Sequence, residues 1–569
     1  MKRAIAIVFI GLLIKASTAG AQTNGAITGR VVADDGAGMA GVTVMLSAVV
    51  AIRGGLSRST TTDEEGNFRF TDLSPRPYSV SAFGSREYVQ PQATTGSGER
   101  RYYRPGENVH ITLIRGGVIT GRVTNAAGEP VIGIQVLAIR VRDADGRTAR
   151  IQGGSSQRLT DDRGVYRIYG LQPGGYIVVA NSNSNYSGGS AYYGETPTYH
   201  PSSTRDAAAE VTVASGTEAS GVDIRYRGEP GHAVSGRMTG VNPGESFAPC
   251  MVYLTHAATG ASFDLMYANP SQGGAFAFYG VPDGEYDLTA ERLESDRNDP
   301  LGSEPRRVTI RGADVTGVEL RLSPRATVEG KVVLDHLPQR CEEKSQPGLE
   351  EIILRARRDD AVKAPLPAAL SIPRDTAANE KGEFLLKSLY PARYRLQVSL
   401  PDDGWYLKSI TGPASATAGG GASASGADIA RGGILLRAGE RLGGVMMTIA
   451  EGAANLRGRV TPGKEGARLS AKLAVHLVPA ETASANDVLR YAETVVEREG
   501  AFEFRNIAPG RYRLLARPMP DDDPSDSPSL PAAWDANGRA KLRKEAEAIK
   551  IEIDLKPCQR VSDQIVKYR

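Results

Sequence analysis

The sequence has 569 residues, of which 65 are glycine and 33 are proline. At about 150 residues per domain, this length indicates roughly three to four domains and excludes a single core, while the glycine and proline content stays below that of low-complexity chains. The 68 basic and 65 acidic residues nearly balance, and the basic excess lies within residues 1–21. A nucleic-acid partner, which needs a basic surface, therefore has no support from composition.

Residues 1–21 have the pattern of a secretory signal peptide. Lys2 and Arg3 precede a mostly apolar stretch from Ala4 to Ile14, and small residues follow up to Ala21. The apolar stretch is too short for a membrane helix, because crossing the hydrocarbon core takes about 20 residues. We expect cleavage after Ala21, export to the periplasm, the cell surface or the medium, and no membrane span.

The chain has three cysteines, which are far apart in the sequence: Cys250, Cys341 and Cys558. Export would place them in an oxidising compartment, but so sparse and odd a set does not form a disulfide framework. The sequence therefore predicts that disulfides do not hold the fold together. Cys250 alternates with Val252 and Leu254, which predicts a small, buried apolar residue on a strand.

One pattern recurs five times along the chain. Each copy opens with an apolar residue, any residue, glycine, a basic residue and an apolar residue, and the five glycines are Gly29, Gly121, Gly236, Gly330 and Gly458. Each copy continues with a Gly-x-aromatic step and, ten residues beyond the aromatic residue, a tyrosine: Tyr78, Tyr176, Tyr286, Tyr394 and Tyr512. Apolar alternation around these positions, with proline and glycine between them, predicts a strand, a tight turn and a strand.

Two turns recur within the copies. Three positions before the glycine of the Gly-x-aromatic step, four copies have a residue typical of the first position of a type I turn: Asp63, Asp161, Ser271 and Asn379. Three copies close with two glycines five residues apart, at Gly216 and Gly221, Gly312 and Gly317, and Gly439 and Gly444. The fifth copy has Cys558 and Asp563 at these two places.

These segments give about seven short strands per ~110 residues, which is typical of a β-sandwich. We predict an all-β protein with five tandem Ig-like or prealbumin-like antiparallel β-sandwich domains after a signal peptide. The expected boundaries are 1–21 for the signal peptide and 22–116, 117–228, 229–324, 325–452 and 453–569 for the sandwiches. Because the junctions are short, we expect an elongated particle.

The first copy contains ITGRVV (27–32), AGVTVML (40–46), DEEGNFRF (63–70) and LSPRPYSVSA (73–82), and the second copy repeats this series within 118–136 and 161–180. These segments resemble the carboxypeptidase regulatory-like domain. The resemblance implies a transthyretin-like sandwich, grouped with carbohydrate-binding-like folds and related to the B repeats of bacterial surface adhesins. It also implies extracytoplasmic modules without catalysis of their own.

The sequence patterns do not indicate a catalytic, cofactor or metal site. The six histidines are scattered over all five copies without the spacing of a zinc site. Gly36, Gly38 and Gly41 match a dinucleotide-binding pattern, but a β-type segment follows them where a phosphate-binding helix would have to begin. We therefore expect a protein that is not an enzyme and that uses neither cofactor nor metal.

Two loops, residues 99–105 and 181–203, are candidate binding surfaces because tyrosines gather in them. Rigid amphipathic rings provide contact area at a low entropic cost in binding loops. The six candidate residues are Tyr102, Tyr103, Tyr186, Tyr192, Tyr193 and Tyr199. The alternative, which we favour, is that Tyr103 and Tyr199, each two residues before a proline, pin their own loops onto the sandwich.

The leading functional hypothesis is an exported, non-catalytic array of modules with a structural, adhesive or binding role at a surface. One alternative is glycan binding through the aromatic loops, and another is a non-catalytic accessory to a secreted enzyme. The corresponding partners are an extracellular glycan or a surface protein. The tyrosines that follow each Gly-x-aromatic step are expected to be packing residues whose hydroxyls reach a backbone group or water.

Overall fold

The computed structural model describes residues 25–49, 57–83, 87–91, 102–144, 146, 149, 156–181, 191–240, 250–268, 273–292, 300–338, 341, 347–359, 375–413, 426–463, 469, 473–519 and 532–568. Strands in these residues form ten sheets, two for each copy of the repeat. The chain is thus an all-β protein of five tandem β-sandwiches, and a separate hydrophobic core fills each of them. The expected signal peptide lies outside the described residues.

Sandwich 1 shows the arrangement that the other four repeat. Its first sheet has the order β4-β1-β7-β6 and its second the order β3-β2-β5. The first strand pairs antiparallel with β4 and parallel with β7. The opening strand of every other sandwich likewise pairs parallel with a strand late in its copy. The strands are β1 (Gly25–Ala33), β2 (Thr43–Ala48), β3 (Ser57–Thr61), β4 (Asn67–Leu73), β5 (Tyr78–Phe83), β6 (Tyr88–Val89) and β7 (Asn108–Arg115).

Sandwich 2 places β8 between β11 and the short strands β15 and β16, opposite a sheet centred on β9 and β12. Its strands are β8 (Gly117–Thr124), β9 (Gln135–Arg142), β10 (Ser156–Leu159), β11 (Val165–Leu171), β12 (Gly174–Asn181), β13 (Thr198–Tyr199), β14 (Val211–Val213), β15 (Glu218–Ala219) and β16 (Ile224–Arg225). A short 3-10 helix, η1 (Arg205–Ala207), follows β13.

Sandwich 3 has the orders β20-β17-β24 and β19-β18-β21-β22-β25, with β23 also paired to β21. Its strands are β17 (His232–Thr239), β18 (Cys250–His256), β19 (Ser262–Ala268), β20 (Ala275–Val281), β21 (Gly284–Arg292), β22 (Leu301–Gly302), β23 (Arg306–Ile310), β24 (Val315–Arg321) and β25 (Ser323–Pro324).

Sandwich 4 has the orders β29-β26-β34-β31-β32 and β28-β27-β30-β33. Its strands are β26 (Ala326–Asp335), β27 (Ile353–Arg358), β28 (Asp375–Ala377), β29 (Glu383–Leu389), β30 (Ala392–Ser399), β31 (Trp405–Gly412), β32 (Ala427–Asp428), β33 (Ile434–Leu436) and β34 (Arg441–Glu451). It also contains η3 (Leu349–Glu351) and a one-turn helix, α2 (Ile429–Gly432).

Sandwich 5 has the orders β38-β35-β41 and β37-β36-β39-β40. A longer helix, α3, packs against the outer face of the second sheet, where Leu542 and Ala546 meet Val478 and Leu515. The elements are β35 (Ala454–Pro462), β36 (Leu473–Pro479), η5 (Val488–Arg490), β37 (Ala492–Val495), η6 (Arg498–Gly500), β38 (Ala501–Ile507), β39 (Gly510–Pro518), η7 (Ala532–Trp534), α3 (Ala536–Ile549), β40 (Glu552–Leu555) and β41 (Arg560–Tyr568).

The glycine that opens each copy is required by a close approach. A Cβ atom on Gly458 would lie 2.1 Å from the carbonyl oxygen of Gln564 on the parallel strand and 2.5 Å from the ring of Phe502. Without a side chain at this position, the opening strand, the last strand and the ring of the Gly-x-aromatic step can meet. The opening glycine and the Gly-x-aromatic step of each copy are therefore in contact. Their recurrence in the sequence reflects this tertiary contact.

The predicted turns are present where the structure describes them. Asp63 accepts a hydrogen bond from the Asn67 amide at 2.6 Å, and the Gly66 amide donates to the Asp63 carbonyl at 3.0 Å. These backbone donors hold the pKa of Asp63 below its usual value. In the closing turn, Cys558 and Asp563 have φ values of 62° and 63°, the left-handed conformation that glycine has in the other copies.

The tyrosine that follows each Gly-x-aromatic step closes a local corner, as predicted. All five rings are buried, and in four copies the hydroxyl donates to the carbonyl four residues upstream. In sandwich 4, the Tyr394 hydroxyl accepts from the Tyr390 amide at 3.0 Å. The residues are Tyr78, Tyr176, Tyr286, Tyr394 and Tyr512. Each ring thus packs in the core of its sandwich while its hydroxyl stays paired.

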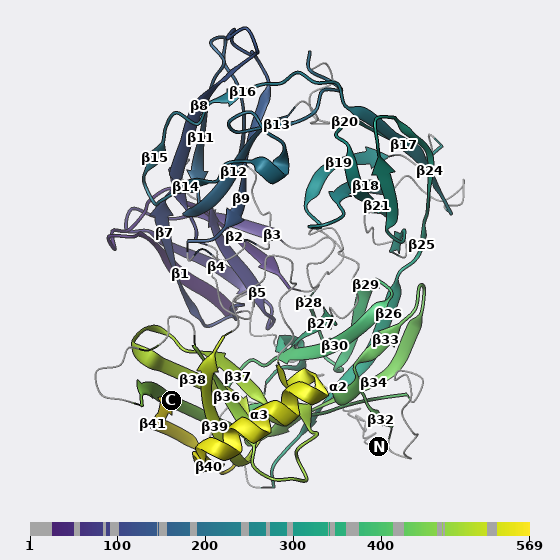
Figure 1. The fold of residues 1–569 in the computed structure, drawn as a ribbon. Coiled ribbons are helices and arrows are strands. Elements are labelled where there is room, and N and C mark those ends of the chain that lie inside the picture. The colour runs from purple at the N-terminus through teal and green to yellow at the C-terminus, as the bar shows by residue number, and fades with distance from the viewer. Residues whose placement is uncertain are drawn as a thin grey trace, which may run out of the picture.

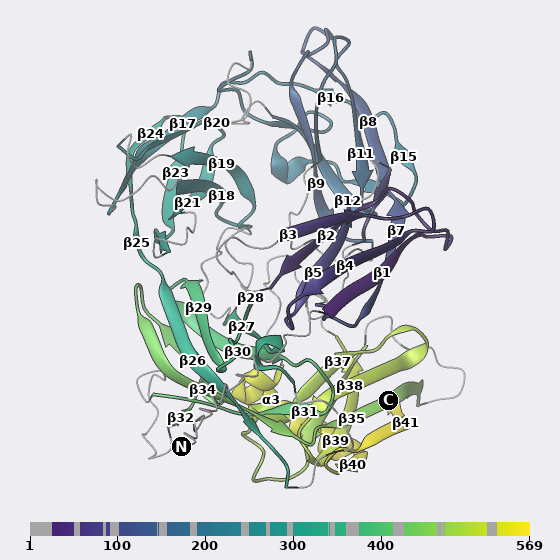
Figure 2. The same cartoon turned by 180° about the vertical axis from the view of Figure 1, so that it is seen from behind.

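The expectation of an elongated particle is wrong, because the chain closes into a ring. Figures 1 and 2 show the sandwiches following one another around a closed path, with sandwich 1 next to sandwich 4. The Tyr102 hydroxyl donates to Asp375, and Arg104 Nη1 donates to the Pro401 carbonyl at 2.9 Å. Arg76 pairs with Glu350 at 3.8 Å. Hydrogen bonds and an ion pair between sandwiches 1 and 4, which are distant in the sequence, therefore close the ring.

The prediction that disulfides do not hold the fold is also wrong for the junction of sandwiches 4 and 5. Cys341 and Cys558 form a disulfide although 217 residues separate them, and their Cα atoms are 5.7 Å apart. The spacing in the sequence does not predict this disulfide, because the pairing depends on how two separate sandwiches pack.

In the part of the chain that the structure describes, we find no helix with the length and apolar character needed to cross a membrane.

Cys250 is free and buried, as its alternation with Val252 and Leu254 predicted. Burial raises the pKa of its thiol to about 11, so that the reactive thiolate is scarce at neutral pH. We expect no reaction of the folded protein with a thiol reagent at pH 8, and one reactive thiol per chain after denaturation without reductant. Rapid labelling of the native protein would contradict this prediction.

Candidate functional site

The six candidate tyrosines have different environments. Tyr186 lies outside the described residues. Tyr103 and Tyr199 are buried, at 8% and 7% exposure. The backbone of Tyr103 exchanges two hydrogen bonds of 2.8 Å with Tyr78, and the backbone of Tyr199 pairs with Val179. Both therefore pin their loops to a sandwich, which is the alternative that the sequence favoured.

Tyr102 takes part in the contact that closes the ring. Its hydroxyl donates to the Asp375 carboxylate on β28 of sandwich 4. The same carboxylate receives two hydrogen bonds from the Arg355 guanidinium, at 2.5 and 2.7 Å. A bidentate arginine holds a carboxylate in a fixed orientation. Tyr102 is therefore engaged between two sandwiches of this chain.

Tyr192 packs against its own sandwich. Its hydroxyl donates to the Ile132 carbonyl at 3.0 Å, and its ring meets Tyr226 edge to face with the centroids 5.8 Å apart. Tyr226 itself is 4% exposed. Tyr192 therefore covers the end of the core in sandwich 2.

Tyr193 is the most exposed of the candidate tyrosines that the structure describes, with 59% of its surface accessible. Its ring lies 5.0 Å from the ring of Tyr279, on β20 of sandwich 3, at an interplanar angle of 45°. Tyr279 is 39% exposed. The two rings come from different sandwiches and contact each other at the junction.

Asp264, on the edge strand β19, lies close enough to affect Tyr193 electrostatically. Its Oδ1 accepts from the Leu265 amide at 2.8 Å. Burial raises the pKa of Asp264 to about 7. Burial also raises the pKa of Tyr193, and the charges of Tyr279 and Asp264 add to this effect. We call Tyr193, Tyr279 and Asp264 the junction site.

Sequence reasoning missed Tyr279 and Asp264. Tyr279 lies on the same strand as the core residues Phe276 and Phe278. A single outward-facing residue on a strand has no sequence signature of a binding role. Asp264 is a single acid within a strand. Neither residue belongs to a motif, and only the packing of two sandwiches brings them to Tyr193.

His256 lies in an aromatic cluster of sandwich 3 near the same junction. The His256 ring lies 5.1 Å from the Tyr286 ring and 5.7 Å from the Phe263 ring. Burial, together with the charge of Arg205 from sandwich 2, lowers the pKa of His256 to about 4. His256 is therefore neutral near pH 7 and acts as a packing residue. Within the described ranges, no three His, Cys, Asp or Glu residues are grouped so that they could hold a metal ion.

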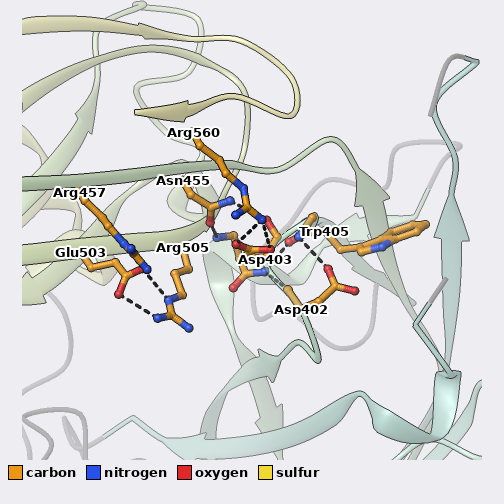
Figure 3. A network of polar contacts seen from close by, with 10 residues as sticks. Asp402, Asp403, Trp405, Asn455, Arg457, Glu503, Arg505 and Arg560 are labelled. Atoms are coloured by element: carbon orange, nitrogen blue, oxygen red, sulfur yellow. Dashed lines mark hydrogen bonds and ion pairs between the residues drawn. The ribbon is translucent and has the colours of Figure 1, made fainter. Parts of the chain in front are cut away.

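The junction of sandwiches 4 and 5 is held by polar contacts and not by exposed rings. The Asn506 side chain donates through Nδ2 to the carbonyls of Asp402 and Trp405 at 2.5 and 2.7 Å. Asn455, labelled in Figure 3, donates to the Asp403 carbonyl at 2.8 Å. Arg560 pairs with the Asp403 carboxylate at 3.0 Å. The network joins the two sandwiches through hydrogen bonds and an ion pair.

We expect Asp264→Asn to stabilise sandwich 3 at pH 8. A carboxyl whose pKa is raised on folding lowers stability as the pH rises from its unfolded value, near 4, to its folded value, about 7. The neutral amide avoids this cost, which we set at about 2 kcal/mol after allowing for solvent screening. Thermal melts of the two proteins should differ at pH 8 and converge at pH 4. Equal stabilities at pH 8 would contradict the prediction.

Comparisons with known proteins identify the module. Residues 26–103 match the family described as carboxypeptidase regulatory-like domain, which corresponds to most of sandwich 1. A comparison with curated protein sequences gave no match.

Among solved structures, the TIE protein of Bacillus anthracis is 13% identical, with 52% of this chain and 50% of that chain covered and a TM-score of 0.14. This chain thus spans half the length of that protein. The minor pilin GBS52 of Streptococcus agalactiae is 14% identical, with coverages of 36% and 96% and a TM-score of 0.20. Two B repeat units of the collagen-binding protein of Staphylococcus aureus are 12% identical, with coverages of 75% and 100% and a TM-score of 0.14.

Proposed function

We propose that this protein is an exported, non-catalytic scaffold with a structural or adhesive role at the cell surface, in which five sandwiches hold binding surfaces in fixed relative positions. The observation that carries the proposal is the ring of bonded junctions. A simple spacer needs only linkers, whereas here side-chain hydrogen bonds, ion pairs and ring contacts join neighbouring sandwiches. Such contacts restrict the relative domain motion that is otherwise the default.

The junction of sandwiches 3 and 4 illustrates this support. Arg325 is 4% exposed, its guanidinium lies 3.3 Å from the ring centroid of Tyr390, and Nη2 donates to the Ser303 carbonyl at 3.1 Å. Burial lowers the pKa of Arg325. A desolvated cation over an aromatic face is a strong contact, so this linker holds one orientation.

The junction of sandwiches 1 and 2 is bonded through main-chain acceptors. The Ser215 hydroxyl donates to the Arg115 carbonyl at 2.8 Å, and Gln172 Nε2 donates to the Gln90 carbonyl at 3.2 Å. These contacts do not depend on ionised groups. The ring is thus held by several kinds of interaction, as a fixed scaffold requires.

The first experiment tests export and location. A tagged chain is expressed in cells of the source organism, which are fractionated and then treated with protease while intact. We expect a mature N-terminus at Gln22 and loss of the tag from intact cells after protease treatment. Retention in the cytoplasm with Met1 intact would overturn the proposal.

A second experiment tests the fixed arrangement. Small-angle scattering of residues 22–569 should give the radius of gyration of a closed ring, and the Tyr102→Phe and Arg104→Ala double variant should give a larger one. Arg163→Ala, which removes an ion pair inside sandwich 2, is the matched control and should leave the value unchanged. A wild type as extended as the double variant would contradict the closed scaffold.

The adhesive role is tested with the same variants in cells. Deletion of the gene should reduce attachment of the cells to a surface, and the wild-type gene should restore it. The two remaining roles are an accessory to a secreted enzyme, to be detected by cross-linking on intact cells, and recognition of a glycan. Hydrolysis of peptides or glycosides by the purified chain, abolished by one Asp or Glu substitution, would show an enzyme instead.

A further inference from the structure

Tyr193 and Tyr279 are two exposed phenol rings that contact each other across the junction of sandwiches 2 and 3. Their centroids lie 5.0 Å apart, and 59% and 39% of their surfaces remain accessible. Tyr193 belongs to a loop of sandwich 2, whereas Tyr279 lies on β20 of sandwich 3. The pair therefore combines close contact with access from the solvent.

Contact and access are the two conditions for oxidative coupling of tyrosines. A one-electron oxidant removes one electron and one proton from each phenol, and the two phenoxyl radicals combine through the ring carbons next to their oxygens. The hydrogen on each of these carbons then moves to the oxygen of the same ring, which restores both phenols. An unpaired hydroxyl is not required, because the new bond forms between carbon atoms.

The arrangement of the two rings suits this bond. Packed aromatic pairs have centroid separations of about 4.5 to 7 Å, and the 5.0 Å of this pair lies near the short end. A bond between two phenol rings leaves the ring planes twisted, and the observed interplanar angle is 45°. After burial, the charge of Tyr279 contributes to the raised pKa of Tyr193, so the two phenol oxygens are close enough to interact electrostatically.

The main chain holds the two rings in place. Gly194, the residue after Tyr193, accepts a hydrogen bond from the Gly231 amide at 2.9 Å. Gly231 in turn packs against Gly280, the residue after Tyr279, so closely that a Cβ on Gly231 would lie 2.3 Å from the carbonyl carbon of Gly280. Gly231 thus connects the main-chain neighbours of both tyrosines, and the contact of the rings does not depend on side-chain packing alone.

The neighbouring pair Tyr192 and Tyr226 has an arrangement that does not suit coupling. Its centroids lie 5.8 Å apart and its ring planes are at 77°, so the edge of one ring meets the face of the other. Tyr226 is 4% exposed, and an oxidising enzyme has no access to it. This pair provides an internal comparison within the same sandwich.

We propose that Tyr193 and Tyr279 form an oxidative cross-linking site, at which a peroxidase and hydrogen peroxide join sandwiches 2 and 3 through a dityrosine bond. Hydrogen peroxide accepts the two electrons and two protons that the phenols lose and leaves as two molecules of water. The bond makes this junction covalent, as the disulfide between Cys341 and Cys558 does for sandwiches 4 and 5. The proposal goes beyond the proposed function, because it needs this junction but no location at the cell surface.

The experiment treats residues 22–569 at low concentration with a haem peroxidase and hydrogen peroxide and isolates the monomer by size exclusion. We expect the blue fluorescence of dityrosine in the monomer. After proteolysis, mass spectrometry should find a cross-linked peptide pair that joins Tyr193 to Tyr279 and has lost two hydrogen atoms. No pair should join Tyr192 to Tyr226. In urea, which unfolds the sandwiches and separates the rings, the pair that joins Tyr193 to Tyr279 should be lost.

The variants Tyr193→Phe and Tyr279→Phe keep the aromatic rings and remove the phenol, so each should abolish this cross-linked pair without changing the fold. The matched control is Tyr267→Phe, which removes another exposed tyrosine, 50% accessible, and should leave the yield unchanged. Met446 is 46% exposed, and its oxidation to the sulfoxide in every variant shows that the oxidant acted.

Two results would overturn the proposal. One is the absence of the cross-linked pair from the folded wild type while Met446 is oxidised. The other is an equal yield between the same two peptides in either phenylalanine variant. Export and ring closure are measured separately, so failure of this site is distinguishable from failure of the scaffold.

Discussion

Replacing Tyr176 by alanine is expected to destabilise sandwich 2 by about 3 to 5 kcal/mol, the usual penalty for emptying a large aromatic site in a core. The ring is 2% exposed, and its hydroxyl donates to the Gln172 carbonyl at 2.7 Å. Because a single domain has only about 5 to 15 kcal/mol of stability, sandwich 2 should unfold at a clearly lower temperature than the other four.

Domain-resolved melting, by hydrogen exchange with mass spectrometry, measures this loss. Tyr176→Phe removes only the hydroxyl and should cost about 0.5 to 1.5 kcal/mol. Tyr193→Ala, in the same sandwich but 59% exposed, should leave melting nearly unchanged. An unfolded sandwich 2 in Tyr193→Ala, with Tyr176→Ala harmless, would reverse our assignment of which tyrosine is structural and which is a surface residue.

Features that arise within one sandwich could be predicted from the sequence. Alternation and turn residues are local, and the contact between Gly458 and the Phe502 ring repeats in all copies, which is why the repeat was visible. The fifth copy, which lacks the two glycines of the closing turn, still has the same backbone conformation there. Cys558 and Asp563 adopt the left-handed conformation at the positions where other copies have glycine.

Features that arise between sandwiches could not be predicted. The ring closes through Tyr102 and Asp375, and the junction site joins Tyr193 to Tyr279, residues that share no pattern in the sequence. Each of these contacts depends on the angles between the sandwiches that separate the two residues. Single side chains such as Arg325 set those angles, and a buried arginine has no recognisable sequence signature.

The loop tyrosines show the same division. Burial of Tyr103 and Tyr199 follows from the proline two residues later, a local cue that favoured the packing interpretation. Exposure of Tyr193 depends on sandwich 3, which covers part of its ring with Tyr279 but does not bury it. The sequence could therefore nominate the loop as a binding surface without identifying the site.

The disulfide between Cys341 and Cys558 should couple the unfolding of sandwiches 4 and 5. It closes a loop of 217 residues, and removing a cross-link over so long a loop increases the entropy of the unfolded chain by the equivalent of about 5 kcal/mol in the chain-entropy model. Cys341→Ser is the better variant, because Cys558 has a φ of 62° and a substitution there would also change the turn.

The two tryptophans of the chain make this effect measurable without a label. Trp405 is buried in sandwich 4, and the Trp534 carbonyl of sandwich 5 accepts from Arg395 of sandwich 4 at 3.3 Å. Fluorescence during urea unfolding therefore reports on these two sandwiches. We expect one transition in the wild type and, in Cys341→Ser, a lower midpoint or two separate transitions.

The control for this experiment is Cys250→Ala, which removes the free cysteine in sandwich 3 and keeps the disulfide. Its tryptophan transition should match that of the wild type, although sandwich 3 itself loses some stability. Reduction of the wild type should reproduce the Cys341→Ser curve, since both remove the same covalent restraint on the unfolded chain. If the midpoint stays the same in Cys341→Ser and after reduction, the interface in Figure 3 alone holds the two sandwiches together.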